Sequence, residues 1–353
     1  MTRSMRAAVY RGVDEVRVEE VEVPKIGPRE VLVRVAACGV CGTDLKKIHY
    51  GLVPPPRIFG HETAGTIAAV GSEVADWSVG ERVVIVHHVP CLSPDCFFCR
   101  RRAFAQCPVY KKTGTTAGFE PAGGGFAEYA RVLDWCVNGG MVRIPDDVTF
   151  EEASFVEPLN TVLKGVRMAD VQAGDTVFVI GQGPIGLLFT RLAHLAGARV
   201  VATDRLDYRL ALARQLGADS ALNPDTDDVS AAILALSEGR GADLAVVAVP
   251  NTRVVAQAFA AVRPAGKVLL FAQTRLDDPL EVDAGAVCMQ EKALLGSYSS
   301  DITLQDEAAD LIFSRRVDVR ALISHRFGLD AIGQALDLAA HPRDHSLKIL
   351  VTP

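Results

Sequence analysis

The sequence lacks any uninterrupted apolar run near the roughly 20 residues that a helix needs to cross a bilayer, although 49% of its 353 residues are hydrophobic. Its first residues, MTRSMRAAVYRG, also lack the apolar centre of a secretory signal peptide. We therefore expect a globular, cytoplasmic protein that does not associate with membranes. Its length is too great for one ordinary hydrophobic core, so two domains are expected.

The sequence also has no excess of positive charge, since it contains 37 lysines and arginines and 43 aspartates and glutamates. Proteins that bind nucleic acid or anionic lipid present clustered basic residues. Internal repeats and low-complexity tracts are absent as well. No nucleic-acid partner is expected, and the partners that remain are small molecules.

The chain has two regions with different sequence patterns. From about Ala7 to Pro145, short β-branched runs such as EVLVRVAA and ERVVIV are broken by glycine and proline, which is typical of an irregular, mostly-β domain. From Gly174 onward, strands, glycine turns and Ala/Leu-rich helices alternate, as in DTVFVIG, PIGLLFTRLAHLAG and ARVVATD. This alternation predicts a parallel sheet with crossover helices. After about Lys292 the chain leaves this unit with a helical TLQDEAADLIFSRR and the strands ALISHRF and SLKILV.

The sharpest motif is the glycine pattern VIGQGPIG, which follows an expected strand and precedes an expected helix. Gly181 permits a tight turn, Gly183 lets a pyrophosphate approach the backbone, and Gly186 lets helix and strand pack closely. Asp204 ends the next strand at about the 20-residue distance expected for an acid that binds the adenosine ribose. The motif predicts a dinucleotide, and Asp204 favours NAD over NADP, although the neighbouring Arg205 could serve a 2′-phosphate.

Four of the eight cysteines lie in the short stretch CLSPDCFFCRRRAFAQC. They could form disulfides, a redox pair or a metal site. The cytoplasm keeps thiols reduced, so a spaced cluster of this kind is more typical of metal ligands. The separate residues Cys136 and Cys288 are expected to be small core residues.

Two further segments, CGVCGTDLKK and FGHETAG, carry residues that suit zinc. Cys41 offers a thiolate and His61 a neutral imidazole, with Glu62 directly adjacent. Taken singly, the cysteine could be a small core residue and the histidine a hydrogen-bonded turn residue. Next to a dinucleotide-binding unit, the three together indicate a catalytic metal.

At these residues the chain resembles the zinc-dependent medium-chain dehydrogenases of the alcohol dehydrogenase superfamily, and the sorbitol and threonine dehydrogenase group is nearest in pattern. The resemblance rests on CGVCGTDL, GHETAGTIAAVGSEV, the cysteine cluster, EEASFVEPL and GQGPIG in this order. It implies an α/β protein with a Rossmann doubly wound parallel sheet over residues 157–292. It also implies a discontinuous, GroES-like, mostly-β catalytic domain over residues 1–156, to which residues 293–353 return. A homodimer or homotetramer is expected.

The resemblance implies two zinc ions per chain. In the family, four cysteines hold a structural zinc, and here their first gap is two residues longer than the family pattern, which a looped-out Ser-Pro-Asp can accommodate. The expected ligands are Cys91, Cys96, Cys99 and Cys107.

For the catalytic zinc, the resemblance implies Cys41 and His61 as ligands, together with either Glu62 or Glu157 and an open position for water or substrate. Adjacent residues of an extended chain point to opposite faces, so Glu62 can join His61 only if the backbone bends there. The choice between the two carboxylates stays open.

Thr43 matches the family hydroxyl that takes the proton of the substrate. Alcohol dehydrogenases continue the proton path with a histidine at the position of Lys46, and a free lysine is already protonated at neutral pH. The proton could leave through a Lys46 of lowered pKa, through water or through His49. Lys46 and Lys47 are otherwise expected to be solvated charges on a helix.

The family also implies which residues line the cofactor, which is expected to be NAD. These are Gly181, Gly183, Pro184, Ile185, Gly186, Asp204, Arg205, Arg209, Val249, Phe271, Ser297 and Tyr298, with Thr161, Pro250 and Ala272 beside them.

The expected reaction is hydride transfer between NAD(H) and a secondary alcohol or ketone. A polyol, cyclitol, amino sugar or β-hydroxy amino acid all remain open as substrates, and Phe119 and Glu120 are candidates for contact with them. Sorbitol dehydrogenases carry an arginine where this chain has Ser297, which argues against sorbitol itself. The alternative is a non-catalytic NAD(H)-binding redox sensor or structural subunit, which would not need an open zinc site.

Overall fold

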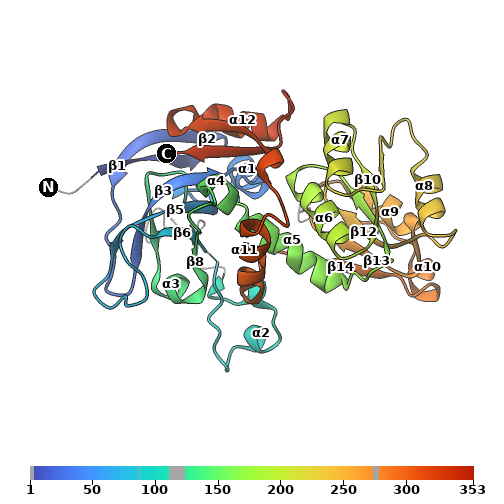
Figure 1. Cartoon of the computed structure of the whole chain (residues 1–353), viewed down its shortest axis with the longest axis horizontal. Helices are drawn as coiled ribbons and strands as arrows, with labels where there is room; N and C mark the ends of the chain where they lie inside the picture. Colours follow the sequence, from blue (N-terminus) through green and yellow to red (C-terminus); the bar gives the residue numbers. More distant parts are fainter. Residues whose placement is uncertain (1–3, 87, 111–123, 273–277) are drawn as a thin grey trace. The chain divides into compact units, whose positions relative to one another are not determined.

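The computed structural model describes residues 4–86, 88–110, 124–272 and 278–353, and the chain folds into two compact units (Figure 1). The first unit comprises Met1–Asn160 and Ser300–Pro353, and the second comprises Thr161–Ser299. The first unit is therefore discontinuous in sequence, and the second is inserted into it. Phe119 and Glu120 lie outside the described residues.

The first unit is built on two β-sheets. One has the strand order β2-β1-β4, and the larger one has the order β15-β16-β3-β5-β6-β8 with β7 paired to β3. Because β16 pairs with β3, the last segment of the chain becomes part of the same sheet as the residues before Cys41. The strands are β1 (Ser4–Gly12), β2 (Glu15–Glu22), β3 (Val31–Gly39), β4 (Arg57–Ile58), β5 (Glu62–Val70), β6 (Arg82–Ile85), β7 (Tyr129–Val132), β8 (Val142–Arg143), β15 (Ile323–Gly328) and β16 (Lys348–Thr352).

Short helices cover these sheets. The longest fully inside the unit, α11 and α12, lie in the expected C-terminal return and bury alanine and leucine stripes. The helices are α1 (Gly42–His49), α2 (Phe97–Arg100), α3 (Asp134–Gly140), α4 (Phe150–Ala153), α11 (Gln305–Phe313) and α12 (Ile332–Ala340), with the 3-10 helices η1 (Phe104–Gln106), η3 (Ile302–Leu304), η4 (Arg320–Leu322) and η5 (Leu329–Ala331).

The second unit is a parallel sheet with the strand order β11-β10-β9-β12-β13-β14 (Figure 1). In chain order this is 3-2-1-4-5-6, the Rossmann arrangement, so the predicted doubly wound sheet is confirmed. The sheet extends past the expected boundary at 292, because β14 pairs with β13. The strands are β9 (Thr176–Ile180), β10 (Arg199–Thr203), β11 (Ser220–Leu222), β12 (Ala242–Val247), β13 (Val262–Leu270) and β14 (Ala293–Gly296).

Helices connect these strands, and their packing differs along the sheet. All five residues of β9 are buried, as expected for the centre of a parallel sheet, and α6 begins with proline at its first turn. In contrast, α10 buries none of its residues, so Cys288 is exposed and the prediction that it is a core residue is wrong. Cys136 is buried as predicted. The helices are α5 (Val156–Ala169), α6 (Pro184–Leu195), α7 (Asp207–Gln215), α8 (Val229–Leu236), α9 (Thr252–Ala261) and α10 (Ala284–Met289).

The chain leaves the first unit after Asn160 and returns at Ser300, and the two crossing points are fastened to each other within the first unit. The buried Asn160 side chain donates to the Asp301 carbonyl oxygen (3.0 Å) and to Gln305 Oε1 (2.8 Å), and it accepts from the Asp301 N–H (2.8 Å). None of the helices among the described residues is long and apolar enough to span a membrane.

Candidate active site

Three residues of the first unit bring possible metal-donor atoms together. Cys41 is the N-cap of α1, His61 lies in irregular backbone directly before β5, and Glu62 is the first residue of β5. The Cys41 sulfur, a His61 ring nitrogen and a Glu62 carboxylate oxygen all lie within 4.8 Å of one another. The backbone therefore bends at His61, as the sequence required, and the mixed sulfur, nitrogen and oxygen set suits a catalytic zinc with an open position.

Asp44 ties two of these residues together from inside the first turn of α1. Its Oδ2 accepts a hydrogen bond from the Cys41 N–H (3.3 Å), and its Oδ1 lies 3.2 Å from His61 Nδ1. Burial acts to raise the pKa of Asp44, but the charge of His61 and its hydrogen bond outweigh it and lower that pKa. A carboxylate at Nδ1 fixes the imidazole ring and leaves Nε2 for a metal.

Lys348 holds the carboxylate of Glu62 in a buried ion pair. Its Nζ lies 2.7 Å from Oε1 and 2.6 Å from Oε2, and the two side chains are only 5% and 2% exposed. Burial acts to lower the pKa of Lys348, but the charges of Glu62 and Cys41 outweigh it and raise that pKa. The lysine is therefore charged and offsets the negative charge of the donor residues.

The absence of a side chain at Gly39 leaves room for the Glu62 carboxylate. Gly39 pairs with Glu62 across β3 and β5, and a Cβ atom at Gly39 would lie 1.9 Å from Glu62 Oε2. A side chain at Gly39 would therefore push the Glu62 carboxylate out of its present position.

Glu157, the competing carboxylate, lies in the first turn of α5 and is not in the three-residue cluster found among the described residues. Burial raises its pKa to about 7, and the charge of His61 acts in the opposite direction. Glu157 is thus close enough to feel the same charges, but the donor atoms that converge in this structure include Glu62.

The four clustered cysteines also converge, around α2 and η1. Cys91 Sγ lies 3.7 Å from Cys99 Sγ and 3.6 Å from Cys107 Sγ, far beyond the roughly 2.05 Å of a disulfide. A tetrahedron with Zn–S bonds of about 2.3 Å has edges of about 3.8 Å. With Cys96, all four sulfurs lie within 4.8 Å of one another. The spacing fits a structural zinc, and the longer first gap does not prevent the convergence.

The residues considered for proton release differ in how far they are exposed to solvent. His49 is 63% exposed and pairs with Asp14 at 3.1 Å. Lys46 and Lys47 are partly buried rather than fully solvated, and burial lowers the pKa of each. The expectation of two freely solvated lysines is therefore wrong for both.

Several residues near the site were not found from the sequence. The His88 ring lies 6.3 Å from the His61 ring, edge to face, and it stacks on Tyr110 at 5.3 Å. The HH pair at 87 and 88 was a visible signal for His88. No sequence signal pointed to Lys348, because it follows its partner Glu62 by 286 residues. A further histidine, His325, lies in β15, and its Nδ1 is 3.0 Å from Ser324 Oγ.

In the second unit, the expected cofactor residues share one edge of the sheet. Gly181 follows β9, Asp204 follows β10, Val249 follows β12 by two residues, Phe271 follows β13, and Ser297 follows β14. The carboxyl ends of parallel strands are where nucleotides bind in doubly wound folds. Residues spread over more than a hundred positions are thus brought to one edge.

The glycine loop has the geometry that a pyrophosphate needs. Gly181 has φ +90°, and a Cβ there would meet Val249 Cγ1 at 2.4 Å, while a Cβ at Gly186 would meet the Gly181 carbonyl oxygen at 1.7 Å. Gly183 is the N-cap of α6, and Pro184 and Ile185 form its first turn. A Cβ at Gly183 would meet nothing closer than 3.9 Å, so the space above it is open to a ligand.

Asp204 is fixed by the loop that it faces. Its Oδ2 accepts from the Gln182 N–H (2.7 Å), its Oδ1 accepts from the Leu206 N–H (3.0 Å), and Arg209 Nη1 lies 3.6 Å from Oδ2. A carboxylate has about four acceptor positions, so two remain for a ribose. Arg205 instead faces solvent, 74% exposed, and pairs with Asp225.

The remaining cofactor candidates differ in exposure. Ser297 is 7% exposed, and its hydroxyl is buried without a hydrogen-bond partner among the described residues, which a bound cofactor could supply. Phe271 packs edge to face on Phe189 at 4.9 Å. Tyr298 is 52% exposed, whereas Thr161 is 9% exposed.

Comparisons with known proteins cover nearly the whole chain. Residues 27–146 match the alcohol dehydrogenase GroES-like domain, and residues 184–314 match the zinc-binding dehydrogenase domain. The chain is 30% identical to a sorbitol dehydrogenase of Bacillus subtilis, over 99% of this chain and 98% of the relative. It is 32% identical to an L-threonine 3-dehydrogenase of Symbiobacterium thermophilum, over 95% and 93%.

A solved structure agrees with these matches. It is described as a zinc-binding dehydrogenase from Sinorhizobium meliloti bound to NADP, and it superposes with a TM-score of 0.89 at 29% identity, covering 99% of this chain and all of that one.

Replacing Lys348 tests the importance of the buried ion pair. Lys348→Met leaves the buried Glu62 carboxylate without its partner, so the free energy of unfolding should fall by about 3–5 kcal/mol. Chemical denaturation of the purified protein measures this. The double variant Lys348→Met with Glu62→Gln should recover most of the loss, because no buried charge remains unpaired.

An exposed ion pair of the same unit is the control. Arg320→Met breaks the Arg320–Asp318 pair, whose side chains are 61% and 43% exposed, and should change stability little. If the two single variants lose equal stability, Lys348 is not the special partner that its burial indicates.

Proposed function

Because the chain belongs to the zinc-dependent medium-chain dehydrogenases, in the group that includes sorbitol and threonine dehydrogenases, we propose that it oxidises a secondary alcohol bearing further polar groups. It is a zinc-dependent oxidoreductase that uses NAD(P) and acts on alcohols. The observation that carries this proposal is the convergence of donor atoms from Cys41, His61 and Glu62. A redox sensor or structural subunit would have no use for such an open donor set.

The proposed ligands of the catalytic zinc are Cys41, His61 and Glu62, with Glu157 near enough to replace Glu62 or to bind through water. The proposed ligands of a structural zinc are the four clustered cysteines. When bound, the catalytic zinc would polarise the alcohol oxygen, and the nicotinamide would accept the hydride. Asp44 would hold the His61 ring in place, and Lys348 would keep the Glu62 carboxylate oriented and its charge offset.

The substrate class follows from the family and from this chain's own residues. A polyol, cyclitol, amino sugar or β-hydroxy amino acid has a secondary carbinol with polar neighbours, and the named relatives act on sorbitol and L-threonine. This chain has Ser297 where sorbitol dehydrogenases carry an arginine, so we consider sorbitol itself the least suitable substrate of this class. The four converging cysteines suit a compartment that keeps thiols reduced, so we propose a cytoplasmic location.

We also propose that two copies associate through an edge of the second unit. The outer side of β14 has no strand partner among the described residues, and Leu294 on it is 43% exposed. On the adjacent α10, which buries nothing, Met289 is 82% exposed. An unpaired sheet edge with apolar side chains is a natural place for self-association.

Metal content and turnover together test the two zinc sites. We expect two zinc ions per chain, and one each in Cys41→Ser and Cys99→Ser, by elemental analysis of freshly purified protein. Cys41→Ser should abolish NAD reduction across a panel of secondary alcohols yet keep a near-normal melting temperature, because its site is open and catalytic.

Cys99→Ser should show the opposite pattern, with a lower melting temperature and residual turnover in the molecules that stay folded. At most one zinc in the unmodified protein would refute the structural site. Full turnover by Cys41→Ser would refute the catalytic one.

Cofactor choice tests the role of Asp204. Two ribose hydrogen bonds to this carboxylate, at about 1.5 kcal/mol each, give at least tenfold preference for NAD over NADP in kcat/KM, before repulsion of a 2′-phosphate is counted. Asp204→Gly should move the preference towards NADP. Asp225→Asn, which frees Arg205 without touching Asp204, is the control and should leave NAD preferred. Equal kcat/KM with both cofactors in the unmodified enzyme contradicts the assignment.

Proton release tests Thr43 against Lys46. Thr43→Ala should lower kcat by about 10²-fold or more, as expected for a lost acid–base contact. Thr43→Ser keeps the hydroxyl and should restore most activity. Lys46→Ala should change kcat by less than about tenfold if water carries the proton onward. The outcome against this route is a Lys46→Ala loss as large as that of Thr43→Ala, together with a missing basic limb in the pH–rate profile.

A further inference from the structure

A fully buried glutamine lies inside the glycine loop of the second unit. Gln182 is 0% exposed and stands between Gly181, which follows β9, and Gly183, which is the N-cap of α6. A buried amide is costly unless its polar atoms are hydrogen-bonded. The contacts of Gln182 therefore show what the loop gains from a polar side chain at this position.

Both ends of the Gln182 amide are bonded to neighbouring elements. Its Oε1 accepts from Thr190 Oγ1 in α6 (2.9 Å), and its Nε2 donates to the Val179 carbonyl oxygen in β9 (3.2 Å). Thr190 is also 0% exposed. The side chain thus joins the strand before the loop to the helix after it.

The backbone of the same residue bonds the acid that is proposed to bind the ribose. The Gln182 N–H donates to Asp204 Oδ2 (2.7 Å), and the Leu206 N–H donates to Asp204 Oδ1 (3.0 Å). These two bonds orient the carboxylate and leave its other acceptor positions for a ligand. The direction of the Gln182 N–H therefore helps to decide where Asp204 points.

The backbone on either side of Gln182 has little restraint of its own. Gly181 and Gly183 flank it, and glycine has more conformational freedom than any other residue. Gly181 lies at φ +90°. A side chain that is held at both ends restricts the residue between these glycines, so its N–H is oriented before a ligand arrives. Such preorganisation strengthens binding, because less ordering is needed at association.

Thr190 uses its hydroxyl for the loop rather than for its own helix. Threonine is a weaker helix former than alanine or leucine, and inside a helix its hydroxyl commonly bonds a carbonyl oxygen three or four residues earlier. Here it donates to Gln182 Oε1. An apolar pair of the same shape could replace the two side chains at little cost in stability. What the polar pair adds is a fixed orientation of the loop.

We propose that Thr190 and Gln182 are positioning residues for the ribose-binding carboxylate and that they act on a bound nucleotide through Asp204. The Thr190 hydroxyl orients Gln182, the Gln182 N–H orients Asp204, and Asp204 selects a ribose that carries its 2′-hydroxyl. The inference rests on the nucleotide site proposed above. It goes further, because Thr190 is buried in α6 and is not among the residues expected to line the cofactor.

Two ligands that differ by one hydroxyl test this on the full-length, zinc-loaded protein. They are NADH and its analogue without the 2′-hydroxyl of the adenosine ribose, and fluorescence titration gives the Kd of each without turnover. The unmodified protein should bind NADH about tenfold more tightly, as expected for one hydrogen bond to a charged acceptor. Thr190→Val keeps the shape of the side chain and should weaken NADH binding about fivefold, but binding of the analogue less than about twofold.

Further variants separate the hydroxyl from the packing. Thr190→Ser keeps the hydroxyl and should restore NADH affinity. Gln182→Met should lose the selectivity in the same way as Thr190→Val. The double variant should be no worse than Gln182→Met alone, because the two residues act in one chain of contacts. It also leaves no buried amide unpaired, so it reports the same loss of selectivity if Thr190→Val folds poorly.

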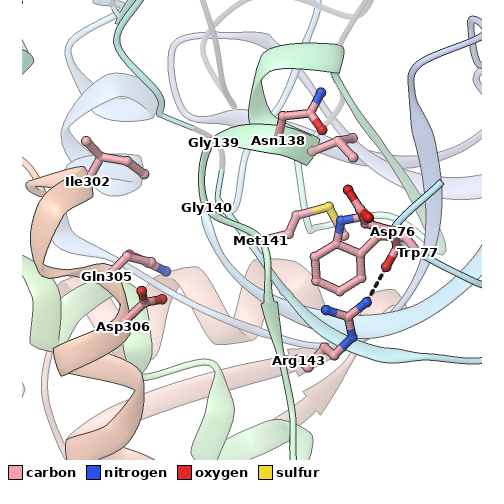
Figure 2. A pocket seen from close by; sticks show the side chains of 11 residues that line it. Asp76, Trp77, Asn138, Gly139, Gly140, Met141, Arg143, Ile302, Gln305 and Asp306 are labelled. Carbon is pink, nitrogen blue, oxygen red and sulfur yellow. Dashed lines mark hydrogen bonds between the residues drawn. The ribbon is translucent and has the colours of Figure 1, made fainter. Parts of the chain in front are cut away.

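Two buried side chains of the same types outside this network provide matched controls. Thr176, also 0% exposed, begins β9, and its hydroxyl donates to the Leu236 carbonyl oxygen (3.4 Å). Gln305, which lines the pocket drawn in Figure 2, is 5% exposed, and its Oε1 accepts from Asn160 Nδ2 (2.8 Å). Thr176→Val and Gln305→Met should lower the melting temperature but leave the ratio of the two Kd values unchanged.

The outcomes separate this inference from the proposed function. If the unmodified protein binds both ligands equally, Asp204 does not bind the 2′-hydroxyl, and the ribose assignment fails together with the positioning role. If the unmodified protein prefers NADH but Thr190→Val weakens both ligands equally, or neither, only the positioning role is overturned. A changed ratio in either control overturns it as well, since the loss of any buried polar contact would then have the same effect.

Discussion

The buried ion pair between Lys348 and Glu62 is the constraint on which the arrangement of the first unit depends. Its two members are 286 residues apart, and the lysine is the first residue of β16. Lys348 Nζ also approaches the Val40 carbonyl oxygen at 3.4 Å, next to Cys41. A buried lysine is tolerated only with a partner, so the returning segment must place it against the carboxylate. This requirement joins the C-terminal strand to the metal-donor residues.

The second unit organises its site by a different principle, which is topology. The parallel strands all end at the same edge, so every residue that directly follows one of these strands is delivered to one place without a long-range ion pair. Gly181 and Asp204 illustrate this, since the carboxylate of one loop accepts the N–H of Gln182 in the other. The proposed nucleotide site is thus built by strand order, and the proposed metal site by charge pairing.

Sequence patterns predicted the nucleotide unit well because its signals are local. A glycine loop between a strand and a helix, followed by an acid at the end of the next strand, predicts the turn, the helix start and the candidate ribose-binding carboxylate within a short segment. The cysteine cluster was likewise readable from spacing. The exposure of single side chains was less predictable. Cys288 lies on a helix that buries none of its residues, and Lys46 is partly buried.

By itself, the sequence determined the family, the doubly wound sheet and the residue types available for zinc, because periodicity, glycine motifs and cysteine spacing act over short distances. Only the tertiary structure decided that Glu62 lies with Cys41 and His61, that Lys348 pairs with Glu62, and that Asn160 bonds Asp301 and Gln305 where the chain re-enters the first unit. These choices depend on which distant segments meet in a buried space. There the cost of an unpaired charge or donor selects the partner, and no local pattern records that selection.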